Sequence, residues 1–176
     1  MRVGLSIVIV NWNTRDLLRN CLQSIYQNPP KDDFEVFVVD NASTDGSPEM
    51  VEKELPQVKL IKNKENLGFS KANNLGIKSS GGDYILLLNS DTQVLRDSLP
   101  KMVEYMDTHP KVGILGPQLI KQDEEIIQMP WGWFPSIFGE MLQKFFTPHR
   151  VQKSKISHVL TVWLQRRERK VPIVAG

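Results

Sequence analysis

The amino-acid sequence predicts an α/β protein with a mostly parallel sheet flanked by helices, and three observations lead to that prediction. Short apolar runs rich in valine, isoleucine and leucine alternate with longer segments whose apolar residues recur at helical spacing. Clusters of polar residues follow the ends of the apolar runs. The chain has 176 residues, 40% of them hydrophobic, which is enough for one domain with a sizeable core. Strands that alternate with helices favour a parallel sheet with helices on its faces.

The first half of this pattern gives two strands and two helices. Residues 5–10 form an unbroken apolar run, which is typical of a buried strand. Residues 14–27 place their apolar side chains on one stripe, which predicts a helix. The same reasoning predicts a second strand at 34–39 and a second helix at 46–55, where Pro48 is tolerated because it falls in the first turn.

The second half continues the alternation. A short apolar run predicts a third strand at 58–61, and helical spacing predicts a helix at 69–79 that a pair of glycines closes. Residues 83–88 form a strongly apolar fourth strand. A helix at 96–108 stops before a proline, and residues 112–115 complete the series as an expected fifth strand.

The pattern changes after the expected fifth strand. Residues 119–128 read as a hairpin, so we expect one α/β part at 1–128 and a second, incomplete segment at 129–176. The second segment is aromatic at its start and strongly basic over 144–170. It closes on a strand-like piece at 171–176, which predicts that the domain is truncated there.

Composition excludes several classes of protein. A single cysteine, Cys21, excludes a disulfide framework and a cysteine-rich zinc site, and three scattered histidines disfavour a histidine metal site. The formal net charge of +2 at pH 7 argues against a strongly basic nucleic-acid binder, so we expect no nucleic-acid partner. The apolar runs fall far short of the ~20 residues that span a bilayer, and no secretory signal is recognisable, which predicts a cytoplasmic protein.

Polar clusters follow four of the expected strands at the point where each strand ends. They lie at 11–13, 40–46, 63–68 and 89–92. Ligands of open parallel sheets bind beyond the carboxyl ends of the strands, so the clusters predict one binding site along one edge. Taken singly, each cluster is also typical of a turn or a helix N-cap. Asp40 differs from the rest, because a carboxylate that ends an apolar strand needs hydrogen bonds from the backbone or from a ligand.

The last cluster, Asn89-Ser90-Asp91, indicates a metal site. Oxygen ligands two residues apart can share a hard divalent cation, and Mg²⁺ takes few protein ligands when substrate phosphates complete its shell. Such a cation suits a diphosphate leaving group, whose charge it neutralises. The alternative is that Ser90 or Asp91 caps the following helix. Neither a Gly-x-Gly-x-x-Gly nor a P-loop pattern occurs, which disfavours dinucleotide and P-loop binding.

Four ordered motifs resemble those of family 2 glycosyltransferases. The motifs are SIVIVNWN from Ser6, VVDNASTDGS from Val38, NLGF from Asn66 with ANNLG from Ala72, and LLLNSDT from Leu86. The resemblance extends over about residues 5–118 and points to the rhamnosyltransferase-like branch, which builds bacterial surface polysaccharides.

The resemblance implies a GT-A fold, a Rossmann-like sheet with a nucleotide-sugar site at the carboxyl ends of its strands. It implies transfer with inversion from a UDP- or dTDP-sugar to a saccharide or lipid-linked acceptor. Asp40 would hold the nucleoside base or ribose, and Asn11 and Asn13 would line the nucleotide pocket. The other sugar-nucleotide ligands that it implies are Asn66, Gly68, Lys71, Asn73, Asn89, Ser90 and Asp91. Of these, Asn89 and Asp91 occupy the metal motif and would contact Mg²⁺ or Mn²⁺.

The sequence departs from the family at two points. The metal motif begins with Asn89 where many relatives have an aspartate, so its first ligand is a neutral amide oxygen. The family's general base lies in an acceptor-binding half beyond the piece at 171–176, so no catalytic base is assigned in this chain. The alternative hypothesis is a fragment that binds the nucleotide-sugar without turnover. A nucleotidyltransferase is disfavoured, because the loop after the first strand is not rich in glycine and basic residues.

Residues 131–170 allow two further interpretations. Their aromatic start and basic continuation suit peripheral contact with the inner face of a membrane, where lipid-linked acceptors lie. The alternative is a helix packed on the rest of the enzyme and followed by a solvated basic linker.

Overall fold

The computed structural model describes residues 3–117, 119–120, 126–128, 131–132 and 173–174. The chain divides into two compact units, Met1–His109 and Pro110–Gly176. The first unit carries every residue that the sequence analysis assigns to the site. The expected boundary at residue 128 stays a prediction.

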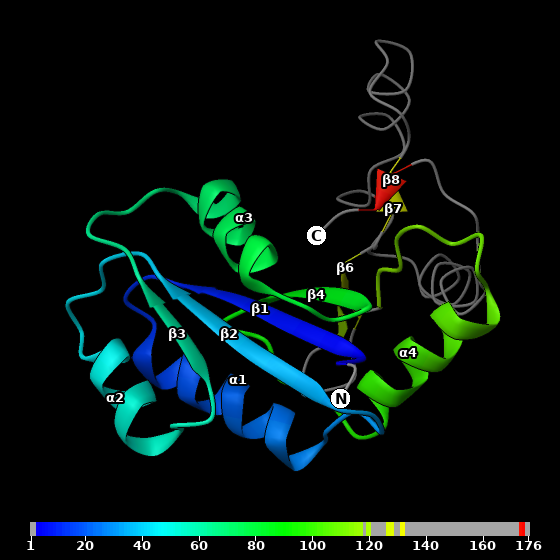
Figure 1. The fold of residues 1–176 in the computed structure, drawn as a ribbon, viewed down its shortest axis with the longest axis horizontal. Coiled ribbons are helices and arrows are strands. Elements are labelled where there is room, and N and C mark those ends of the chain that lie inside the picture. Colours follow the sequence, from blue (N-terminus) through cyan, green and yellow to red (C-terminus); the bar gives the residue numbers. More distant parts are fainter. Residues whose placement is uncertain (1–2, 118, 121–125, 129–130, 133–172, 175–176) are drawn as a thin grey trace, which may run out of the picture. The chain divides into compact units, whose positions relative to one another are not determined.

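A four-stranded parallel sheet forms the centre of the first unit (Figure 1). Its strands, in the order β3-β2-β1-β4, are β1 (Leu5–Asn11), β2 (Phe34–Asp40), β3 (Lys59–Lys62) and β4 (Tyr84–Asn89). The helices are α1 (Arg15–Gln27), α2 (Ser47–Glu54), α3 (Phe69–Ser79) and α4 (Ser98–Thr108). The predicted α/β architecture is confirmed, and each of these elements lies within about two residues of its predicted bounds.

Helices cover both faces of the sheet, with α3 on one face and α1 and α2 on the other (Figure 1). Side chains alternate along a strand, so β1 supplies both faces. Ile7 and Ile9 pack with Leu22 of α1 in the larger core cluster, whereas Val8 packs with Ala72 of α3 in the smaller one. Most of the apolar stripe predicted for α1 is therefore buried, although Leu17 is 48% exposed, and Leu99 is the buried residue of α4.

Gly76 allows α3 to lie close to the sheet. A Cβ atom built on this glycine would lie 2.3 Å from Cγ1 of Val8 in β1 and 3.3 Å from Cγ2 of Val39 in β2. Real Cβ atoms do not approach other atoms so closely. A glycine at this position therefore fixes the distance between helix and sheet, and with it the position of the turn that starts α3.

The strand β4 buries one face and exposes the other within the described part of the chain. Leu86 and Leu88 pack against the larger core cluster. Ile85 and Leu87, on the opposite face, are 43% and 48% exposed. Although β4 is the strongly apolar fourth strand of the sequence analysis, only half of its side chains enter the described core.

The expected fifth strand at 112–115 is wrong. The structure gives these residues no regular secondary structure, and Ile114 is exposed. A four-residue run interrupted by Gly113 buries little surface, and glycine is a poor strand former. Beyond it, β5 (Leu119–Ile120) pairs antiparallel with β6 (Ile126–Gln128), which confirms the two strands of the expected hairpin.

The second unit contains one more described strand pair. β7 (Trp131–Gly132) pairs antiparallel with β8 (Ile173–Val174), so the strand expected at 171–176 is present at its centre. The segment 131–170, for which the sequence allows either peripheral membrane contact or a helix packed on the rest of the enzyme, lies outside the described residues apart from β7. Among the described helices, none combines the length and the apolar character needed to cross a membrane.

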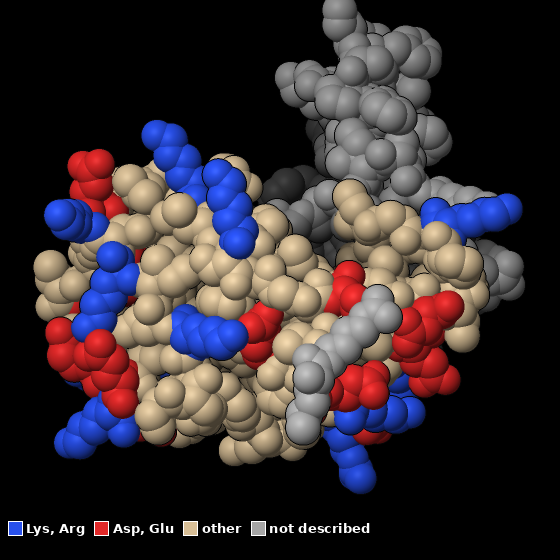
Figure 2. All heavy atoms as spheres, viewed as in Figure 1, with Lys and Arg blue, Asp and Glu red and all other residues tan. Residues whose placement is uncertain are grey.

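Acidic and basic side chains intermingle over the described surface that Figure 2 shows. Several of them form ion pairs between neighbouring elements. Arg19 of α1 contacts Glu54 of α2 at 2.8 Å, and Lys59 of β3 contacts Glu35 of β2 at 2.6 Å. The partly exposed pair of Arg19 and Glu54 stabilises the fold only modestly, whereas the Glu35 side chain is 10% exposed.

Candidate functional site

The parallel register brings the predicted polar clusters to one edge of the sheet. Asn11 at the end of β1 lies opposite Asp40 at the end of β2, and Asp40 lies opposite Lys62 of β3. On the other side of β1, Val10 lies opposite Asn89 at the end of β4. The four strand ends therefore meet as the sequence analysis expects, and hydrogen bonds join them.

Asp40 is buried at this edge and organises the loop that follows β2. Its carboxylate is 2% exposed and accepts hydrogen bonds on both oxygens. The Asn11 side-chain amide donates to Oδ1 at 2.8 Å, and the Ser43 backbone N–H donates to Oδ2 at 2.9 Å. A buried charge is tolerated only with such partners. Asp40 therefore shapes the site from beneath, through Asn11 and Ser43.

The loops after β1 and β2 hold each other in conformations that cost energy. Ala42 and Asn13 have positive φ angles of 60° and 55°, in a region that few L-residues adopt. The Asn13 side-chain oxygen accepts the Thr44 N–H at 2.8 Å, and the Asn13 N–H donates to Ser43 Oγ at 2.9 Å. Backbone strain of this kind concentrates at functional sites.

Ser43 has a hydrogen atom to offer a ligand. Its Oγ accepts hydrogen bonds from the Asn11 amide at 3.0 Å and from the Asn13 N–H at 2.9 Å. Both lone pairs are then used, and the hydroxyl hydrogen has no acceptor among the described residues. The sequence analysis did not single out Ser43, because its role depends on a contact with Asn11, which lies 32 residues earlier in the chain.

Asp45 joins the first turns of two helices. Its carboxylate accepts the Arg15 N–H at the start of α1, at 2.8 Å, and the Ser47 N–H at the start of α2, at 3.0 Å. Burial alone would raise the pKa of this carboxyl, but the hydrogen bonds from Ser47 and Arg15 outweigh burial and hold the pKa below its usual range. The loop between β2 and α2 is thereby fixed to the loop between β1 and α1.

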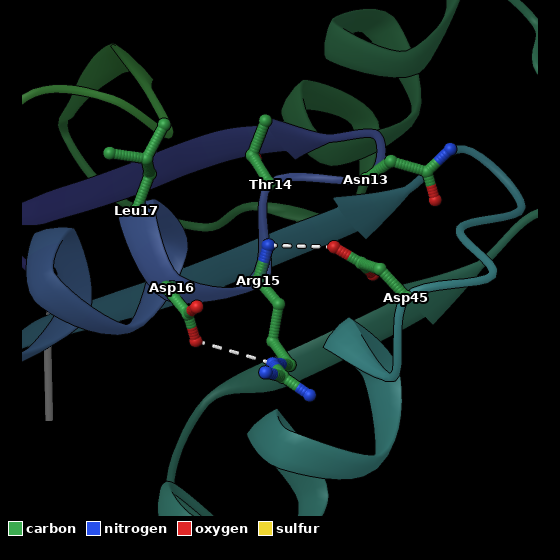
Figure 3. Close-up of a pocket in the computed structure, with 6 residues that line it drawn as sticks. All are labelled: Asn13, Thr14, Arg15, Asp16, Leu17 and Asp45. Atoms are coloured by element: carbon green, nitrogen blue, oxygen red, sulfur yellow. Dashed lines mark hydrogen bonds and ion pairs between the residues drawn. The ribbon is translucent and has the colours of Figure 1, made fainter.

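An open hollow of about 350 Å³ lies beside this junction (Figure 3). Its lining residues are Asn13, Thr14, Arg15, Asp16, Leu17 and Asp45. The Arg15 guanidinium is neutralised there by Asp16 at 3.2 Å, as the dashed line in Figure 3 marks. Among the described residues of the predicted site, only Asn13 lines this hollow. The hollow therefore borders the candidate site.

The ends of β2 and β3 are joined to the start of α3 by asparagines. Asn41 is buried, and its side-chain oxygen accepts the Asn63 amide at 2.9 Å. Asn66 accepts the Gly68 N–H at 2.9 Å, which closes a tight turn, and Gly68 has a φ of 78° that glycine adopts without strain. Asn66 and Gly68 therefore set the direction in which α3 leaves the edge.

The two α3 residues of the predicted site differ in what they contact. Lys71 is exposed in the first turn and forms no ion pair with a described residue, so its ammonium is available to an anion. Asn73 is buried, and its amide donates to the Phe69 carbonyl of the same helix at 3.1 Å. The structure thus gives Asn73 a place in the packing of α3.

At the end of β4, two side chains of the predicted metal motif are free. The Thr92 N–H donates to the Asn89 carbonyl at 3.1 Å, which closes a turn over residues 89–92. Asn89 and Asp91 are exposed, and their side chains make no hydrogen bond or ion pair with the described residues. Ser90 instead places its hydroxyl 2.9 Å from the Thr14 hydroxyl.

A divalent cation fits this turn as one shared between protein and substrate. An amide oxygen from Asn89 and a carboxylate from Asp91 are the oxygen ligands that Mg²⁺ and Mn²⁺ take. No described group of three or more His, Cys, Asp and Glu side chains gathers into a metal site. Two protein ligands with phosphate oxygens completing the shell match the usual coordination of Mg²⁺.

Cys21 lies directly behind the turn. Its thiol points to the Asn89 carbonyl oxygen at 3.6 Å. Burial raises its pKa from 9.0 to about 12, and the negative charge of Asp91 adds to the increase. The thiol therefore stays protonated at neutral pH. Cys21 packs in the larger core cluster and does not act as a nucleophile.

Trp12 is an exposed aromatic residue at this edge, and the sequence analysis left it unassigned. It lies between buried Asn11 and exposed Asn13, and 56% of its surface is accessible. An indole held open between two polar residues offers a flat face to a planar ligand. Its position inside the first motif was the signal that could have found it.

Solved structures of glycosyltransferases share this fold. TarS 1–349 of S. aureus in complex with UDP-GlcNAc matches with a TM-score of 0.57 and 28% identity over 61% of this chain and 32% of that chain. The mannosyltransferase PcManGT from Pyrobaculum calidifontis, in complex with GDP-Man and Mn²⁺, matches with a TM-score of 0.55 and 28% identity, over 60% of this chain and 33% of that one. The GT-A class predicted for the fold is thereby confirmed.

The model of Glycosyl transferase family 2 matches residues 6–168, and the chain belongs to this family. A poly(ribitol-phosphate) beta-glucosyltransferase of Bacillus spizizenii is 37% identical over 100 residues, which are 54% of this chain and 16% of that protein. The chain spans a third or less of the length of these similar proteins.

Proposed function

We propose that this chain is the sugar-nucleotide-binding part of an inverting glycosyltransferase that acts in cell-surface polymer synthesis. One observation carries the proposal: the free Asn89 and Asp91 side chains lie on the same sheet edge as the strained, polar loops after β1 and β2. That edge offers a cation ligand pair beside a surface for a base. The names of the similar proteins, among them a poly(ribitol-phosphate) glucosyltransferase, support a cell-surface polymer as the product.

The loops after β1 and β2 would bind the nucleoside. Asp40 fixes their shape, Asn11 and Asn13 line the pocket, and Ser43 offers its hydroxyl hydrogen to a carbonyl or hydroxyl oxygen of the nucleoside. Trp12 adds a face on which a base can stack, which contributes about 1–3 kcal/mol per base in single-stranded nucleic-acid complexes.

The diphosphate would lie between α3 and the turn after β4. Lys71 supplies a positive charge from the first turn of α3. Asn66, Gly68 and Asn73 shape the start of that helix. Asn89 and Asp91 would hold Mg²⁺ or Mn²⁺, which neutralises the charge that develops on the diphosphate as it leaves.

The choice of donor and acceptor is the finer part of the proposal. We propose a UDP- or dTDP-sugar, with the rhamnosyltransferase-like motifs favouring a deoxyhexose on dTDP, and a saccharide or lipid-linked acceptor. The cytoplasmic side of a membrane would supply both substrates, and residues 131–170 would provide peripheral contact with it.

Calorimetry with and without Mn²⁺ tests the proposal. UDP, dTDP and GDP are titrated into the wild-type chain, Asp91→Ala and the matched control Asp33→Ala, whose side chain is exposed before β2. We expect UDP or dTDP to bind more tightly with Mn²⁺, and Asp91→Ala, but not Asp33→Ala, to abolish the gain. Metal-independent binding, or an equal gain in Asp91→Ala, would refute the metal assignment.

Release of the nucleotide from the bound sugar-nucleotide distinguishes transfer from binding alone. Binding without release, in the presence of saccharide acceptors, supports the alternative in which the chain binds its ligand and does not turn it over. Offering dTDP-rhamnose beside UDP-glucose and UDP-GlcNAc decides the sugar.

A further inference from the structure

We infer that Thr14 is a positioning residue that fastens the candidate metal-binding turn at 89–92 to the candidate nucleoside-binding loop. Its hydroxyl lies 2.7 Å from Asn11 Oδ1 and 2.9 Å from Ser90 Oγ. Thr14 precedes α1, where a threonine side chain ordinarily caps the helix, yet it makes no capping hydrogen bond. Its hydroxyl instead links Asn11, at the end of β1, to Ser90, in the turn after β4.

Asp40 fixes the donor and the acceptor of each hydrogen bond in the series that runs from Asp40 through Asn11 and Thr14 to Ser90. A carboxylate only accepts, so the Asn11 amide turns its NH₂ towards Asp40 and its oxygen towards Thr14. The Thr14 hydroxyl must then donate its one hydrogen to Asn11. It is left with lone pairs alone for Ser90.

Ser90 must therefore donate its hydroxyl hydrogen to Thr14. This assignment leaves Ser90 Oγ with lone pairs for a ligand and no hydrogen to give, so it can accept from a hydroxyl but cannot donate to a phosphate oxygen. The role predicted for Ser90 in binding the sugar-nucleotide is thereby limited to accepting a hydrogen bond from a ligand hydroxyl, in addition to holding the turn.

The Thr14–Ser90 contact holds the turn that presents the candidate metal ligands. Ser90 is the second residue of the turn that the Asn89–Thr92 hydrogen bond closes. Fixing Ser90 towards α1 orders the backbone of the turn while Asn89 and Asp91 stay exposed. Cys21 supports the same turn from behind.

One consequence rests on the proposed function: nucleoside and cation binding should be coupled through Thr14. A nucleoside that orders the loop containing Asn11 would pre-order the turn for the cation, and the reverse must hold to the same degree. Thr14→Val removes the hydroxyl at nearly constant shape, whereas Thr14→Ser keeps it. Thr108→Val is the matched control, since its hydroxyl bonds only to backbone carbonyls and a neighbouring side chain near the end of α4.

The first measurement needs no ligand. Cys21 is the single cysteine of the chain and lies buried behind the turn, so its labelling by a thiol reagent reports opening of that region. We expect Thr14→Val and Ser90→Ala each to accelerate labelling about fivefold, the equivalent of one hydrogen bond, with the double variant no faster than either. The rates should depend weakly on urea, because the opening is local.

The second measurement is the gain in UDP affinity that Mn²⁺ produces. Thr14→Val should reduce this gain about fivefold, more than it reduces UDP affinity without metal, and Thr14→Ser should restore it. Unchanged or additive labelling rates overturn the positioning role. A wild-type chain whose UDP binding ignores Mn²⁺ refutes the metal proposal instead, and labelling then decides the role of Thr14 alone.

Discussion

At the scale of single residues, Asp40 determines the shape of the sheet edge although it lies beneath the surface. Its two oxygens receive the Asn11 amide and the Ser43 N–H, and the network continues from Asn11 through Thr14 to Ser90. The loop that presents Asn13 to a ligand is held by this buried carboxylate through Ser43. Its removal should therefore be felt in stability as well as in binding.

Asp40→Ala should lower the free energy of unfolding by about 2 kcal/mol, because two buried hydrogen-bond donors lose their acceptor. Urea unfolding measures the change, with Asp33→Ala as the matched control at an exposed position. A loss no larger than that of the control would show that Asp40 does not organise the loop.

Cys21 should make stability depend on pH in the alkaline range. Its pKa rises from 9.0 to about 12 because of burial and the charge of Asp91, so the folded state keeps a proton that the unfolded state loses. The stabilisation is present below pH 9 and is lost as the pH rises towards 12. Between pH 8 and 10, the free energy of unfolding measured with urea should fall by about 1 kcal/mol more for the wild type than for Cys21→Ala. Parallel pH profiles would contradict the buried, neutral thiol.

At the scale of elements, Asp45 fixes the first turns of α1 and α2 with one carboxylate. Asp45→Asn should lower the free energy of unfolding at pH 7 by about 1 kcal/mol, because two helix N-termini lose a charged acceptor. Because the pKa of Asp45 is lowered in the folded state, its carboxylate makes stability depend on pH. The stabilisation is present above the usual aspartate pKa and is lost as the pH falls through the lowered pKa. Between pH 7 and pH 3, the free energy of unfolding should fall more for the wild type than for Asp45→Asn. An equal fall in the two proteins would contradict the capping role.

The contact between α3 and the sheet gives a second prediction for elements. Gly76→Ala should destabilise the protein by about 1–3 kcal/mol, because the added methyl group would overlap Val8. Adding Val8→Ala should recover part of that loss. Thermal or urea unfolding measures both, and Gly113→Ala, where a Cβ meets no atom within 4 Å, is the control.

Elements were predictable from the sequence where both period and length were strong. The apolar spacing along α1 and the unbroken run of β1 each allow one interpretation, and the structure contains both elements, with Leu17 the one exposed member of the α1 stripe. Residues 112–115 carried neither signal strongly: four residues around Gly113 look apolar without forming a strand. A strand depends on a partner and on the surface it buries, and neither can be seen in so short a run.

At the scale of the whole molecule, the meeting of the strand ends was predictable because parallel topology alone requires it. Which side chains face outward was not. Asn73 and Asp40 are buried, while Trp12 is exposed. The burial of Asp40 depends on a hydrogen bond from Asn11, in a loop far away in the chain, whereas Asn73 bonds within its own helix. Side-chain type predicted Asn89 and Asp91 as metal ligands, and the structure leaves both side chains exposed. The contact of Ser90 with Thr14 could be seen only in the fold.

The central claim is that a cation and a nucleotide bind together at the carboxyl edge of the sheet. The most direct measurement compares amide NMR spectra of the isotopically labelled chain with UDP and either Mn²⁺, which is paramagnetic, or diamagnetic Mg²⁺. Mn²⁺ should selectively broaden the amide signals of residues 89–92 and of the loops at 11–14 and 41–44. Signals from the opposite edge, such as Gly4, Asp33 and Gly82, should persist. Broadening centred away from residues 89–92, or none in the presence of UDP, would contradict the account.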